Sequence, residues 1–154
     1  MTRRRPPARR EGRQQRLEVR RIVSASPARV FAAWTDPDQL RRWWGPPGAT
    51  CPAAEVDLRV GGRYRIGNSF PDGRTIWIVG EFEVVRPPNE LVYTWWLEPG
   101  PPRAERVSVR FHRREGATEV VVVHERIPDL ATRVQHEQGW ASCLDRLLEH
   151  FRAS

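Results

Sequence analysis

The spacing of apolar residues changes along the chain, and this change predicts where strands and helices lie. In the segments 76–84, 91–97 and 107–111, every second residue is apolar or aromatic, which is the period of a strand with one buried face. Residues 17–23 form a further predicted strand. In the segment 140–151, apolar residues recur three and four positions apart, which is the period of an amphipathic helix. The pattern therefore predicts a sheet that is followed by one long helix.

Two short helices are predicted between the first strand and the rest of the sheet. Ser26 and Asp36 are good capping residues, and each is followed by a proline, which is favoured at the first helical position. Gln39, three residues after Asp36, completes a capping-box pattern. Gly45 and the two prolines after it end the second helix, because proline cannot continue a helix.

The remaining strands are joined by short turns. Gly61 and Gly62 are predicted to form a hairpin turn after a strand at 55–60, and Pro-Asp-Gly at 71–73 forms another. Residues 118–125 continue the strand alternation and place the imidazole of His124 on the inward face. Because consecutive strands with short connections pair side by side, we expect an antiparallel sheet.

The C-terminal helix is predicted to begin at a further capping box, formed by Thr132 and Gln135. About 20 helical residues span roughly 30 Å, which is the width of a small domain. A helix of this length with one apolar stripe needs a broad apolar partner, and the sheet provides it. The stripe consists of Trp140, Leu144, Leu147, Leu148 and Phe151.

Gly139 interrupts this helix at a cost of about 1 kcal/mol relative to alanine. We interpret the glycine as a position of close packing between helix and sheet. The alternative is a close approach of the helix backbone to a ligand or to a facing tryptophan.

Length and charge indicate one folded domain behind a basic tail. Residues 1–16 have no apolar periodicity, so we expect a disordered Arg-rich tail, followed by a single domain over residues 17–154. Residues 1–21 carry nine Arg and two Glu, which accounts for the whole net charge of +7. Because the rest of the chain is neutral and contains no lysine, we do not expect a nucleic-acid partner.

Other features narrow the class of protein. Cys51 and Cys143 match no metal-binding or redox spacing, so we expect reduced thiols in a cytoplasmic protein. No segment approaches the roughly 18 apolar residues of a membrane span, and no apolar stretch follows the basic run as in a secretory signal. Phosphate-binding and dinucleotide-binding glycine motifs are absent, and we expect no cofactor.

The order of elements resembles the helix-grip fold of the START-like, or SRPBCC, superfamily. Within it, residues 20–151 are similar to the bacterial activator of Hsp90 ATPase homologue-like family. The motifs that carry this resemblance are FAAWTDPDQLRRWWGP (31–46), DLRVGGRYRI (57–66), PPNELVYTWW (87–96), TEVVVVHE (118–125) and HEQGWASCLDRLLEHF (136–151).

The resemblance implies an α+β helix-grip fold, in which a curved antiparallel sheet of about six or seven strands surrounds the long C-terminal helix. The superfamily includes lipid carriers, cyclases and binding proteins, so the fold alone does not choose among them. Eukaryotic co-chaperones of this kind carry an additional N-terminal domain for much of the chaperone contact. Only a short basic tail precedes the fold here, so we do not take the family name as evidence of chaperone stimulation.

A long helix cannot touch a strongly curved sheet along its whole length, so we expect an apolar cavity between them. Seven tryptophans in 154 residues agree with an aromatic interior. The expected ligand-binding residues are Trp43, Trp44, Tyr64, Ile66, Ile78, Phe82, Tyr93, Trp95, Val109, Phe111, Val122, His124, Trp140 and Cys143. For each residue alone, the alternative is a role in core packing.

Two histidines are candidates for chemistry in this cavity. His124, near the end of the last strand, is the candidate catalytic residue, and His136, near the start of the helix, lies at the same end of the predicted cavity. Glu125 points away from His124 by strand parity, so the two are not a dyad. We find no convergent carboxylates and expect no metal site.

Three functions remain open. We expect binding of a lipid-like or aromatic small molecule rather than catalysis. The first alternative is a cyclase-like or hydrolase-like enzyme that uses the same cavity, and the second is a chaperone-related or regulatory protein-interaction module. A homodimer is also considered, because Trp77 and Trp96 are predicted on the outer face of the sheet, where exposed tryptophan is costly.

Overall fold

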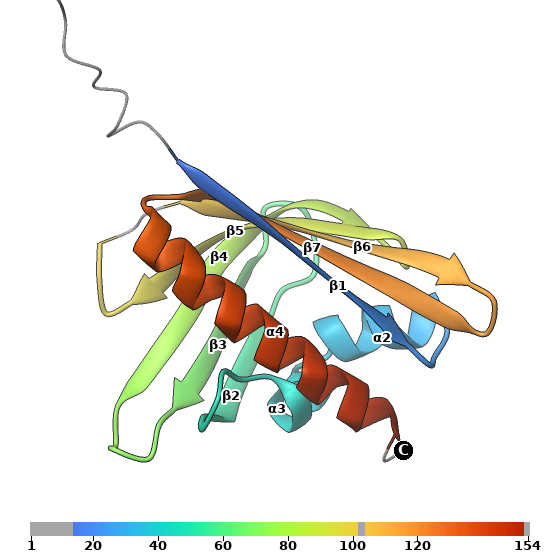
Figure 1. The fold of residues 1–154 in the computed structure, drawn as a ribbon, viewed down its shortest axis with the longest axis horizontal. Helices are drawn as coiled ribbons and strands as arrows, with labels where there is room; N and C mark the ends of the chain where they lie inside the picture. The colour runs from blue at the N-terminus through green and yellow to red at the C-terminus, as the bar shows by residue number, and fades with distance from the viewer. Residues whose placement is uncertain (1–13, 102–103, 153–154) are drawn as a thin grey trace, which may run out of the picture.

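The computed structural model describes residues 14–101 and 104–152, which form one antiparallel sheet with three helices against its concave side (Figure 1). In chain order the elements are β1 (Gln15–Val23), α2 (Pro27–Thr35), α3 (Pro37–Trp43), β2 (Thr50–Val56), β3 (Arg63–Ser69), β4 (Thr75–Arg86), β5 (Glu90–Glu98), β6 (Glu105–Arg114), β7 (Ala117–Ile127) and α4 (Leu130–Arg152). This order confirms the predicted helix-grip fold.

Seven strands pair in the order β1-β7-β6-β5-β4-β3-β2, and every pair is antiparallel. Strands β2 to β7 follow one another in sequence and in space, as the short turns predict. The first strand completes the sheet by pairing with the last. Figure 1 shows the half that contains β2, β3 and β4 turning away from β1 and β7, so that the sheet curves around α4.

Two strand boundaries differ from the prediction. β1 begins at Gln15 because this residue pairs with Ile127, whereas the predicted tail extended to residue 16. The part of the predicted tail at residues 1–13 lies outside the described residues. β2 covers Thr50–Val56 rather than 55–60, because the chain leaves the sheet after Val56 and Leu58 is exposed.

The starts of the helices are fixed by side-chain caps. Ser26 Oγ accepts from the backbone N–H of Arg29 at 3.3 Å, and Asp36 caps α3, as predicted. The capping box predicted at Thr132 is wrong. The α4 helix starts at Leu130, and the carboxylate of Asp129 accepts from the backbone N–H of Thr132 at 2.8 Å.

The apolar stripe of α4 is buried chiefly against β1, at one side of the curved sheet. Trp140, Leu144 and Leu147 are fully or almost fully buried, while Leu148 and Phe151 pack at the edge of the core. None of the helices in the described part of the chain has the length and apolar character that a membrane span requires.

The two short helices fill the space over β6 and its neighbours with aromatic side chains. Phe31 and Trp34 of α2 contact Phe111 of β6 with ring centroids 5.4 and 5.9 Å apart. Trp43 donates its indole N–H to the carbonyl oxygen of Ala33 at 2.9 Å. These contacts leave no room for a ligand beside Phe111.

Trp77 and Trp96 lie half-buried rather than fully exposed. The guanidinium of Arg65 stacks over the Trp77 ring at 4.0 Å from its centroid, and Gly67 lies directly against the same ring. The chain itself therefore covers part of Trp77, and this reduces the cost that motivated the homodimer prediction. The homodimer stays a prediction.

Alanine substitutions at Gly80 and Gly139 should change the free energy of unfolding in opposite directions. A Cβ atom on Gly80 would lie 1.8 Å from the carbonyl oxygen of Thr94, whereas a Cβ atom on Gly139 would meet no described heavy atom within 4 Å beyond its chain neighbours and the backbone of its own helix. Gly80→Ala should lower the free energy of unfolding by about 1–3 kcal/mol or more, because the β4–β5 pair must move apart. Gly139→Ala should raise it by about 1 kcal/mol through helix propensity. Urea denaturation measures both changes, and a loss of stability in both variants would contradict this assignment.

Candidate functional site

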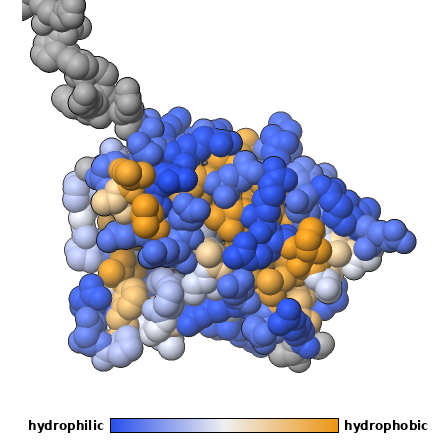
Figure 2. All heavy atoms as spheres, in the orientation of Figure 1, coloured by the Kyte–Doolittle hydropathy of each residue, from blue (hydrophilic) through white to orange (hydrophobic). Residues whose placement is uncertain are grey.

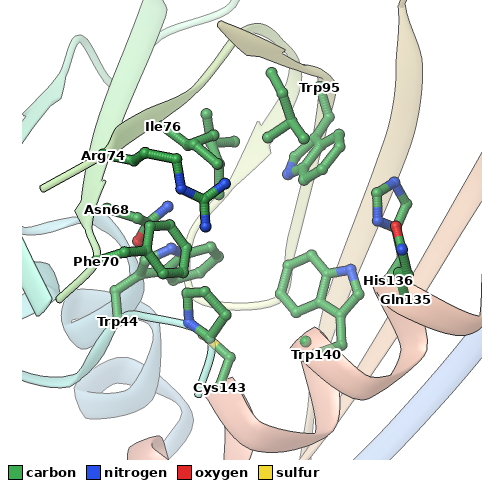
Figure 3. Close-up of a pocket in the computed structure, with 14 residues that line it drawn as sticks. Trp44, Asn68, Phe70, Arg74, Ile76, Trp95, Gln135, His136, Trp140 and Cys143 are labelled. Atoms are coloured by element: carbon green, nitrogen blue, oxygen red, sulfur yellow. The ribbon is translucent and has the colours of Figure 1, made fainter. Parts of the chain in front are cut away.

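A cavity of about 480 Å³ lies between α4 and the strands β3, β4 and β5 (Figure 3). This volume is within the range of small-molecule sites in proteins, roughly 300–1,000 Å³. Tryptophan rings and aliphatic side chains form most of its wall. The lining residues are Trp44, Pro46, Asn68, Phe70, Arg74, Ile76, Ile78, Trp95, Leu97, Gln135, His136, Gly139, Trp140 and Cys143.

The cavity follows from the way α4 is held. The helix packs on β1, while the sheet curves away at β3 and β4 and does not follow it. The wall behind the cavity is aromatic: Trp140 contacts Trp44 edge to face at 5.5 Å and stacks on Trp34 at 6.1 Å. Gly139 adds no side chain to the space, so our interpretation of this glycine as a close-packing position is wrong.

Five of the predicted ligand-binding residues line this cavity: Trp44, Ile78, Trp95, Trp140 and Cys143. Four others border a separate space of about 20 Å³, which is too small for an organic ligand: Tyr64, Ile66, Phe82 and Tyr93. Their aromatic rings fill that space by packing on one another, with Tyr64 and Tyr93 only 5.0 Å apart.

The remaining predicted residues lie in the core and do not reach the cavity: Trp43, Val109, Phe111, Val122 and His124. The aromatic side chains of α2 pack against Phe111. His124 is separated from the cavity by the rings of Trp95, His136 and Trp140, which contact it. Strand parity cannot distinguish an inward residue under a short helix from one that faces the cavity.

Several lining residues were not expected from the sequence. Asn68 continues the inward alternation of Tyr64 and Ile66, so strand parity was a usable signal for it. Phe70 and Arg74 lie at the β3–β4 turn, where parity gives no guidance. Figure 3 shows Asn68, Phe70 and Arg74 on one side of the cavity and Gln135 and His136 on the other.

Three polar atoms of the wall are buried and have no hydrogen-bonding partner among the described residues. They are Trp44 Nε1, Trp95 Nε1 and Asn68 Oδ1, and all three belong to residues that line the cavity. An unpaired buried polar group costs about 1–3 kcal/mol. These atoms lie beneath the surface of the wall, so the described residues leave three polar groups unsatisfied around the cavity.

A buried cluster of one carboxylate and two imidazoles lies at one end of the cavity. Glu105 Oε1 is 2.8 Å from His124 Nε2 and 3.1 Å from His136 Nε2. Glu105 and His124 are 5% and 0% exposed, and only His136 of the three lines the cavity. Trp95 contacts both imidazoles edge to face, with ring centroids 4.7 Å from each.

Glu105 was missed by the sequence analysis, although a signal for it exists. The alternation of Val107, Val109 and Phe111 extends backward by one step to Glu105, which places its carboxylate inward. Our expectation that no carboxylate converges on the histidines is therefore wrong. The inward orientation of His124 is confirmed.

Trp140 fixes the protonation of His124. Its indole N–H, which can only donate, lies 3.0 Å from His124 Nδ1. Nδ1 must therefore accept, and the proton of the neutral imidazole is on Nε2, from which it is donated to Glu105. Protonating Nδ1 as well would place two donors against each other.

Burial and hydrogen bonding shift the pKa values of this cluster. Burial lowers the pKa of His124, and the hydrogen bond to Glu105 offsets only part of this effect. Burial alone would raise the pKa of Glu105, but the hydrogen bonds from His124 and His136 bring it below its ordinary value. The cluster thus contains a carboxylate and a neutral His124 near pH 7.

The same three residues are the candidate metal ligands of the described part of the chain, since one ligand atom from each lies within 4.8 Å of the others. A histidine that binds a metal through Nε2 normally carries its proton on Nδ1 and donates it. At His124, Nδ1 instead accepts from Trp140. The hydrogen-bond pattern therefore does not fit a metal at His124.

The other reactive side chain of the cavity is a thiol. Burial raises the pKa of Cys143 to about 12, so this residue is neutral at physiological pH. Cys143 and Cys51 are both buried and do not form a disulfide. Cys143 thus acts as part of the apolar wall rather than as a nucleophile.

Comparison with known proteins gives the family. Residues 24–152 match the family described as Activator of Hsp90 ATPase homolog 1-like protein, which covers nearly all of the described chain. The chain belongs to the Activator of Hsp90 ATPase homolog 1-like family. This confirms the resemblance that the sequence motifs carry. A search of curated proteins found no match.

Solved structures with the fold of the Activator of Hsp90 ATPase homolog 1-like family superpose closely on this chain. The AHSA1 protein from Silicibacter pomeroyi is 26% identical, with a TM-score of 0.80 over 90% of this chain and 99% of that one. A protein from Chromobacterium violaceum is also 26% identical, with a TM-score of 0.79 over 88% and 96% of the two chains. A protein from Rhizobium leguminosarum, 24% identical with a TM-score of 0.79 over 92% and 96%, shares the fold.

The first prediction from the cluster concerns stability and pH. Because the pKa of His124 is lowered on folding, the unfolded chain binds more protons than the folded one below about pH 6.5, the ordinary pKa of histidine. The free energy of unfolding should fall as the pH drops from 7.5 to 5.5, and less so in His124→Gln. Urea titrations across this range measure the effect.

Burial also lowers the pKa of His150 at the far end of α4, so His150→Gln should reduce the pH dependence as well, and the double variant separates the two contributions. The contribution of Glu105 is lost only at lower pH, as the pH falls below its ordinary pKa of about 4.3 toward the lower pKa of the folded state. Equal pH dependence in the wild type and His124→Gln would contradict the assignment.

The second prediction concerns the tautomer of His124. Long-range ¹H–¹⁵N spectra should show a protonated Nε2 and an unprotonated Nδ1 between pH 6.5 and 8, because Trp140 occupies Nδ1. Adding one equivalent of Zn²⁺ should leave these signals in place. A proton on Nδ1, or a zinc-dependent shift of both imidazoles, would show that the hydrogen-bond assignment is incorrect.

Proposed function

We propose that this protein binds an apolar small molecule, either lipid-like or aromatic, in the cavity between α4 and β3–β5. The observation that carries the proposal is the cavity of about 480 Å³, with three tryptophans in its wall. Sites for organic ligands combine apolar walls with a few polar groups that set orientation. Asn68, Arg74 and His136 supply such groups here.

The burial of the three tryptophans also supports the binding of a small molecule. Trp44, Trp95 and Trp140 are each 5–6% exposed, so their positions are fixed by packing before any ligand arrives. A site that is preformed in this way loses little conformational entropy on binding.

Gly139 offers a direct test. A phenylalanine at this position would project into the open space of the cavity, while alanine would leave most of it empty. The wild type and Gly139→Ala should show thermal stabilisation with members of a panel of fatty acids, naphthalenes, indoles and coumarins. A ligand at 100 times its dissociation constant adds about 2.7 kcal/mol to the stability of the folded state.

Gly139→Phe should lose this stabilisation while remaining folded, as checked by circular dichroism. If no compound of the panel raises the melting temperature of the wild type, or if Gly139→Phe responds as Gly139→Ala does, the proposed function is contradicted.

One observation favours a second candidate, an enzyme of the cyclase or hydrolase kind. Catalysis in an apolar cavity needs an oriented acid–base group, and His136 lines the cavity with Glu105 behind it. Turnover that is lost in His136→Gln, while ligand binding persists, would support this candidate over a carrier.

The third candidate, a protein-interaction module, has less support on the face that bears α4. Figure 2 shows hydrophilic atoms over most of this face, with hydrophobic atoms gathered in separate groups. Interaction surfaces are usually marked by a contiguous apolar patch of several hundred Å².

A further inference from the structure

From the geometry we infer that His136 is the proton acceptor of the cavity, and that its ligand is a ring-sized apolar molecule with a phenol-type or enol-type hydroxyl group. This inference rests on the proposed function, because it names the chemistry of the molecule that the cavity takes. It starts from the two imidazoles, which share one carboxylate but differ in their second ring nitrogen.

His124 cannot accept a proton from a ligand. Its Nδ1 is occupied by the N–H of Trp140 at 3.0 Å, its Nε2 donates to Glu105 at 2.8 Å, and the residue is 0% exposed. Both ring nitrogens are therefore engaged, and the imidazole does not line the cavity. His124 acts as a positioning residue for the carboxylate of Glu105.

His136 has the opposite arrangement. Its Nε2 lies 3.1 Å from Glu105 Oε1, so in the neutral imidazole this nitrogen carries the proton and Nδ1 keeps its lone pair. Nδ1 has no hydrogen-bonding partner among the described residues, and the ring lines the cavity. A free acceptor nitrogen at the wall of an apolar cavity is suited to a hydroxyl donor.

Glu105 stabilises the product of proton transfer. The O–H bond of the ligand breaks, the proton moves to Nδ1 of His136, and an imidazolium forms beside the carboxylate while the ligand keeps the negative charge as an oxyanion. The three charges alternate in sign along the row carboxylate, imidazolium and oxyanion. In a buried site, the attraction between neighbouring opposite charges is stronger than it is in water. This attraction stabilises the ionised ligand beside the imidazolium.

Two cationic side chains of the surrounding elements are paired elsewhere. Arg106 of β6 pairs with Glu83 and Glu125, and Arg133 of α4 pairs with Glu137. The described groups that face His136 are Glu105 from β6, His124 from β7, Trp95 from β5 and Trp140 from its own helix. Glu105 is therefore the charged group that contacts His136 directly.

The opposite end of the cavity suits an acceptor oxygen. Figure 3 shows Arg74 and Asn68 across the cavity from His136. In a ligand with a hydroxyl at one end and a carbonyl at the other, the carbonyl oxygen would lie near the guanidinium of Arg74, which can donate a hydrogen bond to it.

7-Hydroxycoumarin has this shape, and its spectrum distinguishes the neutral phenol from the phenolate. 7-Methoxycoumarin has the same ring system without the proton. We expect the wild type to bind 7-hydroxycoumarin with a hydroxyl pKa at least about one unit below that of the free compound, which is roughly tenfold more phenolate at a given pH. The hydroxy compound should also bind more tightly than the methoxy compound.

In His136→Gln, both the pKa shift and the preference for the hydroxy compound should disappear. Glu105→Gln should reduce the shift, because the imidazolium loses its carboxylate. His150→Gln, which changes a histidine at the other end of α4, should behave as the wild type does. Circular dichroism and thermal melts check that each variant is folded. If His136→Gln does not fold, the reduced pKa shift expected in Glu105→Gln still tests the inference.

The outcomes separate this inference from the proposed function. If both coumarins bind with equal affinity and the hydroxyl pKa is unshifted, or if His136→Gln keeps the shift, His136 is not the proton acceptor, although the cavity still binds ligands. If neither coumarin binds in the cavity, the inference is wrong. The proposed function is then tested by the thermal shifts with the fatty acids, naphthalenes and indoles of the panel.

Discussion

The structure depends on one constraint, which is that a straight helix with one apolar stripe can follow only part of a curved sheet. α4 buries Trp140, Leu144 and Leu147 where it packs on β1, and this contact fixes the position of the helix. Over β3–β5 the sheet curves away, and at Gly139 the helix carries no side chain that could fill the gap. The cavity is the space that remains.

Helices α2 and α3 decide how large this space is. Their aromatic side chains fill the half of the concave face near Phe111, and Trp34 closes the boundary by stacking on Trp140. The core of the protein and the wall of the cavity are thus made of the same tryptophans. A ring that is held rigidly by the core on one side is a preorganised surface for a ligand on the other.

The hydrogen-bonded row from Trp140 through His124 and Glu105 to His136 links the core to the cavity. It begins with a donor-only indole, and each following group is constrained by the one before it. Two histidines that share one carboxylate therefore have different roles, since one is fixed in its neutral form and the other keeps a free acceptor nitrogen. The burial of Glu105 and His124 strengthens these hydrogen bonds, because they are electrostatically stronger inside a protein than in water.

Local patterns in the sequence predicted the fold well and the site only in part. Strand alternation gave the inward faces, including that of His124, and proline-marked caps gave α2 and α3 correctly. The pattern did not separate Phe111, which lies under α2, from Trp95, which faces the cavity, because that depends on contacts between distant segments. Strand alternation could have identified Glu105 as an inward residue, because it lies two positions before Val107. The role of Gly139 and the tautomer of His124 depended on the three-dimensional arrangement alone.

The most direct measurement of the central claim is a crystal structure of the protein with 7-methoxycoumarin. The account predicts electron density for the ring system between Trp95 and Trp140, within the cavity beside Gly139. Tryptophan side chains that collapse into the cavity, with the compound absent or bound at another place, would contradict it.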